Sequence, residues 1–208
     1  MKKILSVFLL LFVAFLFQVS AHAQEEMMVL NVQGNASIIR EGQSLPASVG
    51  MACQKGDILK TGADCLLDVS MNRLAGMRVL ASSECEVVGA NKEAMNLKVT
   101  SGNVILNLEK LPSDSTFQLE TPTAIASVRG TQFWGRVDLQ KMENPVTTFA
   151  VREGAIEVFA KSVGKSFTIE QGQALDIPKD ETVVPSVRPA LAGELAAMEQ
   201  ASSIKTSA

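Results

Sequence analysis

Few residues in this chain are arranged in the combinations that support catalysis. The 208-residue sequence has one histidine, His22, and no tyrosine. His22 lies in an N-terminal segment that we expect to be removed, so the mature chain has no Ser–His or Cys–His nucleophile system. Ser162 and Lys165 have Ser-x-x-Lys spacing, but that chemistry needs a helix to align the two side chains, whereas Gly164 favours a loop. The carboxylates are scattered, and no two of them stand out as a pair for glycoside hydrolysis. We therefore predict that the chain is not an enzyme.

Three cysteines, Cys53, Cys65 and Cys85, are the remaining reactive groups. Their spacings of 12 and 20 residues match no usual zinc motif, so we expect no metal and no cofactor. Cys65 and Cys85 are a candidate disulfide, because two stacked turns of chain or one hairpin would bring them together. The alternative is that both are small buried hydrophobic side chains, as we expect for the free thiol of Cys53.

The N-terminus has the pattern of a secretory signal peptide. Lys2 and Lys3 precede the apolar run Ile4–Val19, and Ala21-His22-Ala23 supplies small residues for cleavage. The alternative is an uncleaved membrane anchor, but a run of about 16 residues is shorter than the ~20 that span a bilayer. We predict that residues 1–23 are a signal peptide, cleaved after Ala23. The mature protein would then be exported, with the periplasm as the expected location.

Signal removal also sets the charge of the mature chain. It leaves 17 basic and 22 acidic residues, a formal net charge of −5. A weakly acidic chain with no basic block has no electrostatic reason to bind nucleic acid or anionic lipid. A second long apolar run is absent, so we expect no transmembrane segment after cleavage.

Alternating polar and apolar residues indicate an all-β domain over residues 30–180. Ala155–Ala160 is one such run. An aliphatic residue, two mostly polar residues and a glycine recur at intervals near 20 residues, and 80–83 keeps the phase without its glycine. The five glycines are Gly42, Gly62, Gly102, Gly154 and Gly172. This period predicts a β-solenoid-like or rolled β-sandwich architecture of short strands. A plain antiparallel meander is the alternative, since hairpins can space glycines in the same way.

Residues 181–208 differ in composition from the β region. Pro185 and Pro189 mark a linker, and residues 190–200 are rich in good helix formers. Leu191, Leu195 and Met198 would form one apolar stripe. We expect either a short C-terminal helix packed on the β domain or a frayed tail, because about 11 residues alone are marginally helical. Residues 202–208 are expected to be disordered.

Four ordered motifs make residues 30–177 resemble the FecR domain. The central one is Thr121–Phe133, which reads TPTAIASVRGTQF and contains Val-Arg-Gly-Thr-x-Phe. The segment 56–62 resembles the family's early Gly-Asp-x-aliphatic-x-Thr turn. Residues 151–158 resemble its strand pair after the signature, and Gly172-Gln173 resembles its closing turn.

This resemblance implies an all-β extracytoplasmic domain without catalysis. In well-known members the domain is the periplasmic half of an anti-sigma regulator that receives a signal from an outer-membrane transporter. Only three residues precede the apolar run here, so we expect no cytoplasmic sigma-binding half. The sequence is more similar to stand-alone exported FecR-domain proteins.

Two residues of the signature are candidates for binding. Arg129 either donates to backbone carbonyls at a turn or contacts a ligand or partner. Phe133 and Trp134 are adjacent, so they point to opposite faces of a strand. If Phe133 lies in the core, Trp134 is either an exposed anchor or is covered by the hairpin that ends near Pro145.

Three functions remain open from the sequence. The first is a non-catalytic exported binding or scaffold module of the bacterial cell envelope that recognises a protein or an envelope polymer. The second is a periplasmic regulatory module that cooperates with a separate membrane signalling protein of anti-sigma type. The third, favoured least, is a carbohydrate-active enzyme.

Overall fold

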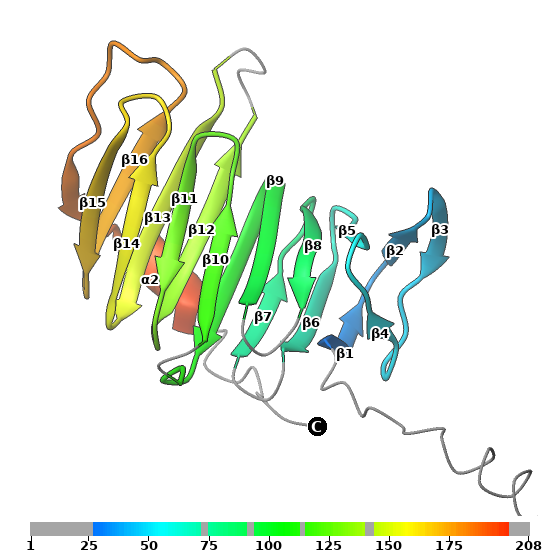
Figure 1. The fold of residues 1–208 in the computed structure, drawn as a ribbon. Helices are drawn as coiled ribbons and strands as arrows, with labels where there is room; N and C mark the ends of the chain where they lie inside the picture. The colour runs from blue at the N-terminus through cyan, green and yellow to red at the C-terminus, as the bar shows by residue number, and fades with distance from the viewer. Residues whose placement is uncertain (1–26, 72–74, 91–93, 113–114, 140–143, 200–208) are drawn as a thin grey trace, which may run out of the picture.

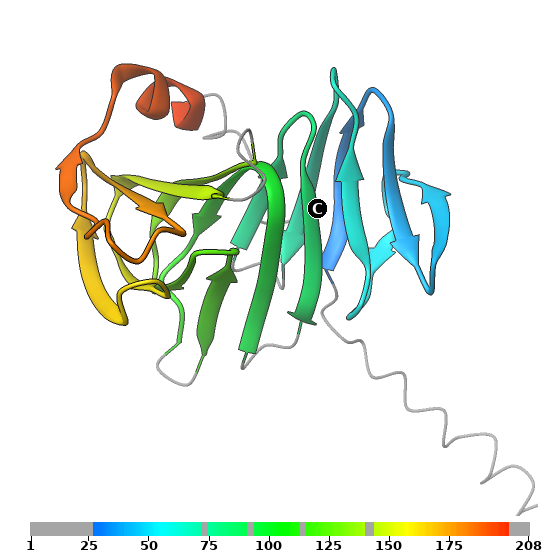
Figure 2. The same ribbon diagram turned by 90° about the horizontal axis from the view of Figure 1, so that it is seen from above.

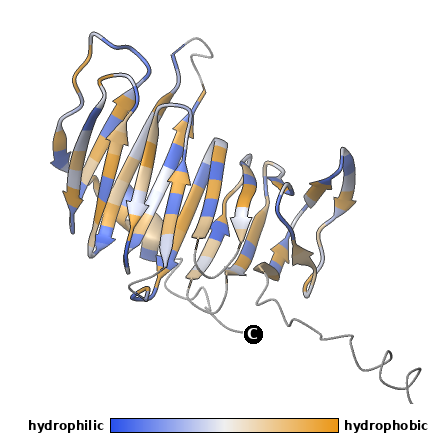
Figure 3. Ribbon diagram, in the orientation of Figure 1, coloured by the Kyte–Doolittle hydropathy of each residue, from blue (hydrophilic) through white to orange (hydrophobic). Residues whose placement is uncertain are grey.

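Alternation of apolar and polar residues places one face of nearly every strand in a shared interior. The structure, a computed structural model, describes residues 27–71, 75–90, 94–112, 115–139 and 144–199. The predicted signal peptide (1–23) and residues 200–208 lie outside the described residues. Figure 3 shows the alternation along the strands. In Ala155–Ala160, residues Ile156, Val158 and Ala160 are buried while the residues between them are exposed.

The strands form two layers that lie face to face along one elongated body (Figures 1 and 2). Layer A has the order β4 (Ala52–Cys53), β1 (Met27–Gln33), β6 (Leu66–Met71), β7 (Ala75–Val79), β9 (Ala94–Leu108), β12 (Gln132–Asp138), β13 (Val146–Glu153), β16 (Gln173–Pro178) and β17 (Val187–Pro189). Layer B has the order β3 (Gln43–Pro46), β2 (Ala36–Arg40), β5 (Ile58–Thr61), β8 (Glu84–Ala90), β9, β10 (Thr116–Glu120), β11 (Ala124–Val128), β14 (Ala155–Ala160) and β15 (Lys165–Glu170).

Strand β9 belongs to both layers. Residues 95–101 pair with β8 and residues 102–108 pair with β7 or β12, so the strand bends from one layer into the other near Gly102. Among the described strands only β9 and β10 pair in parallel. Coils of a solenoid would stack with their strands parallel. Because all other described pairs here are antiparallel, the fold is a rolled sandwich that extends along one axis. The all-β fold with a short C-terminal helix is confirmed.

The regularly spaced glycines mark places where the chain changes layer. Gly62, Gly102, Gly154 and Gly172 lie at such crossings, whereas Gly42 lies in the hairpin between β2 and β3. Crossings that are adjacent along the axis contact one another. The Gly62 carbonyl accepts a hydrogen bond from the Ser82 N–H at 2.9 Å, and Ser82 adopts a φ of 53° in the repeat that has no glycine. The crossings therefore form a stacked row.

Apolar side chains from both layers fill the interior. Phe117, Phe133 and Phe149 are among its largest fully buried members, and the rings of Phe133 and Phe149 lie 6.3 Å apart between centroids with a 58° tilt. Of the adjacent residues Phe133 and Trp134, Phe133 is therefore the one that lies in the interior between the layers.

The C-terminal helix α2 (Ala192–Glu199) packs on the outer face of layer A, against β12 and β13 (Figure 2). Met198 is fully buried there and Leu195 partly buried, whereas Leu191 is 61% exposed. The predicted helix is thus present and docked, and the predicted stripe contacts the sheet through two of its three residues. Strand β17 lies within the segment that was expected to be a linker.

Substitution of a crossing glycine should destabilise the fold more than substitution of a hairpin glycine. Gly102 has φ +82°, and an added Cβ would overlap the Ser83 side chain and lie 2.5 Å from the Ser83 Cα. Gly42 has φ +79° with nothing within 4 Å of the added atom. We expect Gly102→Ala to lower the free energy of unfolding by at least ~3 kcal/mol, and Gly42→Ala by about 1 kcal/mol from backbone strain alone. Urea unfolding of both variants measures the difference, and equal losses would contradict the stacked row.

Candidate functional site

The central motif forms the β10–β11 turn and attaches it to the opposite layer. Thr121, Thr123 and Thr147 are all buried. The Thr123 hydroxyl donates to Thr147 Oγ1 at 2.7 Å, and the Thr147 hydroxyl donates to Thr121 Oγ1 at 2.9 Å. Thr121 Oγ1 also accepts from the Ala124 N–H at 3.0 Å. Burying a hydroxyl costs free energy unless it is hydrogen-bonded, so these hydrogen bonds fix the motif against β13.

The Arg129-Gly130 pair forms the crossing from β11 to β12. Gly130 has φ +73°, and a Cβ on it would lie 2.9 Å from the Lys110 Cα, so both its backbone conformation and its close packing favour glycine. The Thr131 hydroxyl donates to the Ala155 carbonyl at 2.9 Å, which joins the crossing to the start of β14. Arg129 is exposed at this crossing.

Arg129 borders a depression of about 340 Å³ on the outer face of layer B. Its lining residues come from β10, β11, β14, β15 and the segments beside them: Ser115, Thr116, Phe117, Gln118, Ser127, Val128, Arg129, Ala155, Ile156, Glu157 and Thr168. This volume is at the lower end of the range for ligand sites. The small side chain of Ala155 on the outer face helps to leave the hollow.

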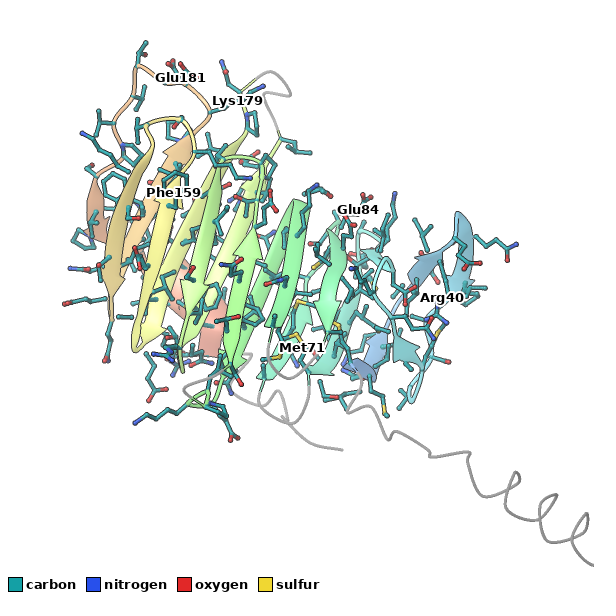
Figure 4. The ribbon with its side chains drawn as sticks, viewed as in Figure 1. Arg40, Met71, Glu84, Phe159, Lys179 and Glu181 are labelled. Atoms are coloured by element: carbon teal, nitrogen blue, oxygen red, sulfur yellow. The ribbon has the colours of Figure 1, made fainter. Side chains whose placement is uncertain are left out.

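Strand register aligns the polar lining into one row. Gln118 is paired with Ser127, Ser127 with Glu157, and Glu157 with Thr168, on four neighbouring strands. All four side chains are exposed. Phe159 follows Glu157 on the same face of β14 and is 42% exposed (Figure 4). An aromatic ring beside a row of hydrogen-bonding groups is suited to contact a partner.

The early motif contributes a buried ion pair in the N-terminal half. The Asp57 carboxylate is 1% exposed and accepts from Arg40 Nε at 2.9 Å, from Arg40 Nη2 at 2.7 Å and from the Gln54 N–H at 2.7 Å. Burial opposes ionisation of Asp57, but the hydrogen bonds from Arg40 and Gln54 outweigh it and hold the pKa of this carboxyl below its usual value. The motif's Thr61 is also internal, donating to the Leu80 carbonyl at 2.6 Å.

Residues 57–157 match the family described as FecR protein. This chain carries a FecR domain. The matched region begins at Asp57 of the early motif, contains the whole Thr121–Phe133 signature and ends in β14 beside the depression. The resemblance predicted from the sequence is therefore confirmed over these residues.

Comparisons of the FecR domain with solved structures agree on the fold. Two crystal structures, at 2.50 Å and 1.65 Å resolution, are each described as "a putative anti-sigma factor from Parabacteroides distasonis ATCC 8503". Each shows 12% sequence identity and a TM-score of 0.58, over 69% of this chain and 64% of the other chain. This chain thus spans less than two thirds of their length, and at this identity the likeness concerns the fold. The search of curated proteins found no match.

Trp134, the second predicted binding residue, is not an exposed anchor in the structure. Its side chain lies on the outer face of layer A, opposite to Phe133, but it is only 7% exposed. It packs with Ile105, Ala150, Ala174 and Met198, so α2 covers it. Trp134 is therefore unavailable to a partner while α2 is docked, and Phe159 is the exposed aromatic residue that the sequence analysis missed.

The three cysteines of the FecR-domain chain are buried free thiols. The Cys65–Cys85 bridge that was a candidate is not formed. Cys85 lies on the inward face of layer B, where it pairs with Leu59 and Val99, whereas Cys65 lies outside the strands in the crossing that precedes β6. Burial raises the pKa of Cys53 and of Cys85 to about 12, so these two thiols are poor nucleophiles.

The part of the chain that the structure describes has neither a candidate metal cluster nor a membrane-spanning helix. Within it, no three His, Cys, Asp or Glu side chains gather in a way that could hold a metal ion. Helix α2 is far too short to cross a bilayer, and the same residues form no other helix that is longer and apolar.

Loss of the Asp57 carboxylate should remove part of the acid sensitivity of the fold. The folded-state pKa lies below the unfolded value of about 3.9, so the ion pair stabilises the fold above that pH and is lost as the pH falls through the folded-state pKa. We expect Asp57→Asn to lower the free energy of unfolding by about 2 kcal/mol at pH 7, with a smaller difference below about pH 4.

Glu84→Gln is the matched control for this prediction. It removes the partly exposed Lys60–Glu84 pair at 3.2 Å, for which we expect a change within about 0.5 kcal/mol. Denaturant unfolding of both variants from pH 3 to pH 7 makes the measurement. A loss for Asp57→Asn that is the same at every pH would contradict the assignment.

Proposed function

We propose that this chain is exported and acts in the bacterial cell envelope as a non-catalytic regulatory binding module. Membership of the FecR family supports a regulatory role, and the fold shared with proteins described as anti-sigma factors agrees with it. Under this proposal residues 1–23 are removed on export, and the FecR domain meets its partner in the periplasm. A separate membrane protein would carry the signal onward.

The proposal assigns partner binding to the outer face of layer B around the depression. The observation that carries it is the combination of the 340 Å³ hollow, the row of exposed polar side chains and the exposed ring of Phe159. Arg129 borders this surface from the family's central motif. A protein partner that supplies an acidic group and an apolar side chain would complement Arg129 and Phe159.

Strand edges are less suitable for such a partner. Strand β17 ends at Pro189 and β3 ends at Pro46, and proline lacks the N–H that an added strand would need. Strand β4 has only two residues. These features protect three of the sheet edges, which favours recognition through the face of layer B over strand addition.

A second candidate function is attachment to an envelope polysaccharide, as a scaffold. The row from Gln118 to Thr168 runs across strands that are spaced about 4.8 Å apart. Amide, hydroxyl and carboxylate groups in such a row can bind the hydroxyls of successive sugars while Phe159 contacts a sugar face. The same residues would serve either partner, so one experiment distinguishes the two functions.

Photo-crosslinking from the depression tests the proposed function. A photoreactive amino acid at position 168 in the mature chain should capture a partner in envelope extract, and protease or glycosidase digestion then identifies it as protein or polysaccharide. We expect Arg129→Glu to abolish capture, and Phe159→Ala to weaken it about tenfold. Capture by all variants alike, or release of sugar products by the protein, would overturn the proposal.

Two substitutions away from the depression serve as controls. Lys55→Glu makes the same change of charge as Arg129→Glu, and Val49→Ala removes a side chain that is 69% exposed. Both positions lie between β3 and β5, in the N-terminal half. Capture should be unchanged in both variants, and circular dichroism of all four verifies that they are folded.

A further inference from the structure

A single row of side chains crosses the outer face of layer A from one end of the molecule to the other. Successive register pairs connect strands β1, β6, β7, β9, β12, β13, β16 and β17. The row consists of Asn31, Asp68, Arg78, Ile105, Trp134, Ala150, Ala174 and Arg188. The two ends are polar or charged and the middle is apolar. We call Ile105, Trp134, Ala150 and Ala174 the covered patch.

The polar end of the row near the N-terminus is satisfied by hydrogen bonds between its own side chains. Arg78 donates to both oxygens of Asp68, at 2.6 Å and 2.8 Å, and Asn31 donates to Asp68 at 3.2 Å. The side chains of the covered patch are apolar and have no comparable set of hydrogen bonds. Its four residues are 0–7% exposed because α2 lies over them. An outer sheet face is usually polar, so this apolar patch is built to receive another element.

Helix α2 shows what kind of element fits. Met198 lies on the covered patch with none of its side chain exposed, next to two alanines whose short side chains leave room for it. One helical turn earlier, Glu194 accepts from Arg188 at 2.7 Å and 3.0 Å and from the Leu191 N–H at 2.7 Å. The pattern that is recognised is therefore an acid in the first turn followed by an apolar residue four positions later.

Arg188 keeps a partner whether or not α2 is docked. It donates to Asp176 through Nε at 2.7 Å and through Nη2 at 3.0 Å. The hydrogen bonds from Arg188 and then from Thr148 hold the pKa of Asp176 below its usual value, so this pair stays ionised at neutral pH. Undocking of α2 thus leaves Arg188 with a counter-charge, whereas Arg152 loses its 3.7 Å contact with the Glu199 carboxylate. It uncovers a patch with Arg188 already oriented at its edge.

The hold of α2 on this surface is small. The helix has eight residues with a glycine in its first turn, a length that is not stable alone in water. Only Glu194 and Met198 of α2 are buried, and Leu191 at its start is mostly exposed. A longer helix with the same acid and apolar residues could cover more of the apolar surface, including the partly buried Leu80 at its margin.

We propose that the covered patch is an interaction surface for an amphipathic helix of a partner protein, and that α2 occupies this surface in cis. The partner helix carries a carboxylate that binds Arg188 and, four residues later, an apolar side chain that replaces Met198. It must displace α2 to bind, which makes α2 an internal competitor. This surface is on the opposite layer from the depression beside Arg129, and the proposal stands independently of that site.

Trp134 is the only tryptophan of the chain, so its fluorescence reports directly on the covered patch. In full-length protein, Glu194→Arg places a second cation against Arg188 and should release α2. We expect the emission of Trp134 to shift to longer wavelength and its quenching by acrylamide to rise. Glu181→Arg makes the same substitution in the exposed loop before β17 and should leave both unchanged (Figure 4).

A synthetic peptide of residues 189–199 then tests binding in trans. Added to the Glu194→Arg protein, the native peptide should reverse the red shift in a saturable way. Peptides with Glu194→Arg or Met198→Asp should not. A labelled native peptide should bind the Glu194→Arg protein more tightly than the unmodified protein, in which α2 competes.

Several results would overturn the proposal. These are unchanged Trp134 emission in the Glu194→Arg protein, no effect of the native peptide, or equal effects of all three peptides. If circular dichroism shows that Glu194→Arg has lost its β structure, Met198→Ala serves as the releasing variant with the same peptides. The same outcomes then apply to it.

Discussion

The stacked layer crossings constrain the rest of this structure. Two layers share one interior, so the chain must pass repeatedly from one layer to the other, and neighbouring crossings lie in contact. At Gly102 the backbone lies against Ser83, and at Gly154 an added Cβ would lie 2.9 Å from the Gly130 carbonyl oxygen. Because each crossing limits the position of the next, the register of every strand depends on the crossings beside it. A register that is maintained along the whole molecule is what allows side chains to line up in rows on both outer faces.

The two outer faces use this register differently. On layer B the row from Gln118 to Thr168 is exposed and polar, and it borders a hollow. On layer A the middle of the row is apolar and lies beneath α2. Strand β9 takes part in both layers, so the two faces belong to one continuous sheet and are positioned by the same core. The FecR match extends from β5 to β14 and includes strands of both faces.

Much of this could be predicted from local patterns. Alternation revealed which residues face inward, as in Ala155–Ala160, and four of the five periodic glycines, Gly62, Gly102, Gly154 and Gly172, lie at crossings. Pairing between distant strands could not be predicted, because an alternating segment fits many partners equally well. The hydroxyl chain to Thr147 and the ion pair of Asp57 with Arg40 depend on such pairing, and so does the separation of Cys65 from Cys85. Trp134 was correctly assigned to the face opposite Phe133, but its cover comes from a helix about 60 residues away in sequence. Phe159 was missed, because an aromatic residue in an alternating strand is more often part of the core, and nothing local marked this one as exposed.

The way in which α2 is attached bears on whether it is only a structural cap. A permanent cap would be expected to bury most of its surface in apolar contacts, whose loss would expose a large area. Here one methionine fills the patch, and the remaining strong contacts are hydrogen bonds between Arg188 and Glu194. Arg188 is 28% exposed in its side chain and retains Asp176 when Glu194 leaves, so water and Asp176 can satisfy it in the released state. The free energy that holds α2 in place therefore comes mainly from the burial of Met198 and Trp134, on the order of a few kcal/mol. Docking of that strength keeps the patch covered in the isolated protein and still leaves it open to a helix that buries more.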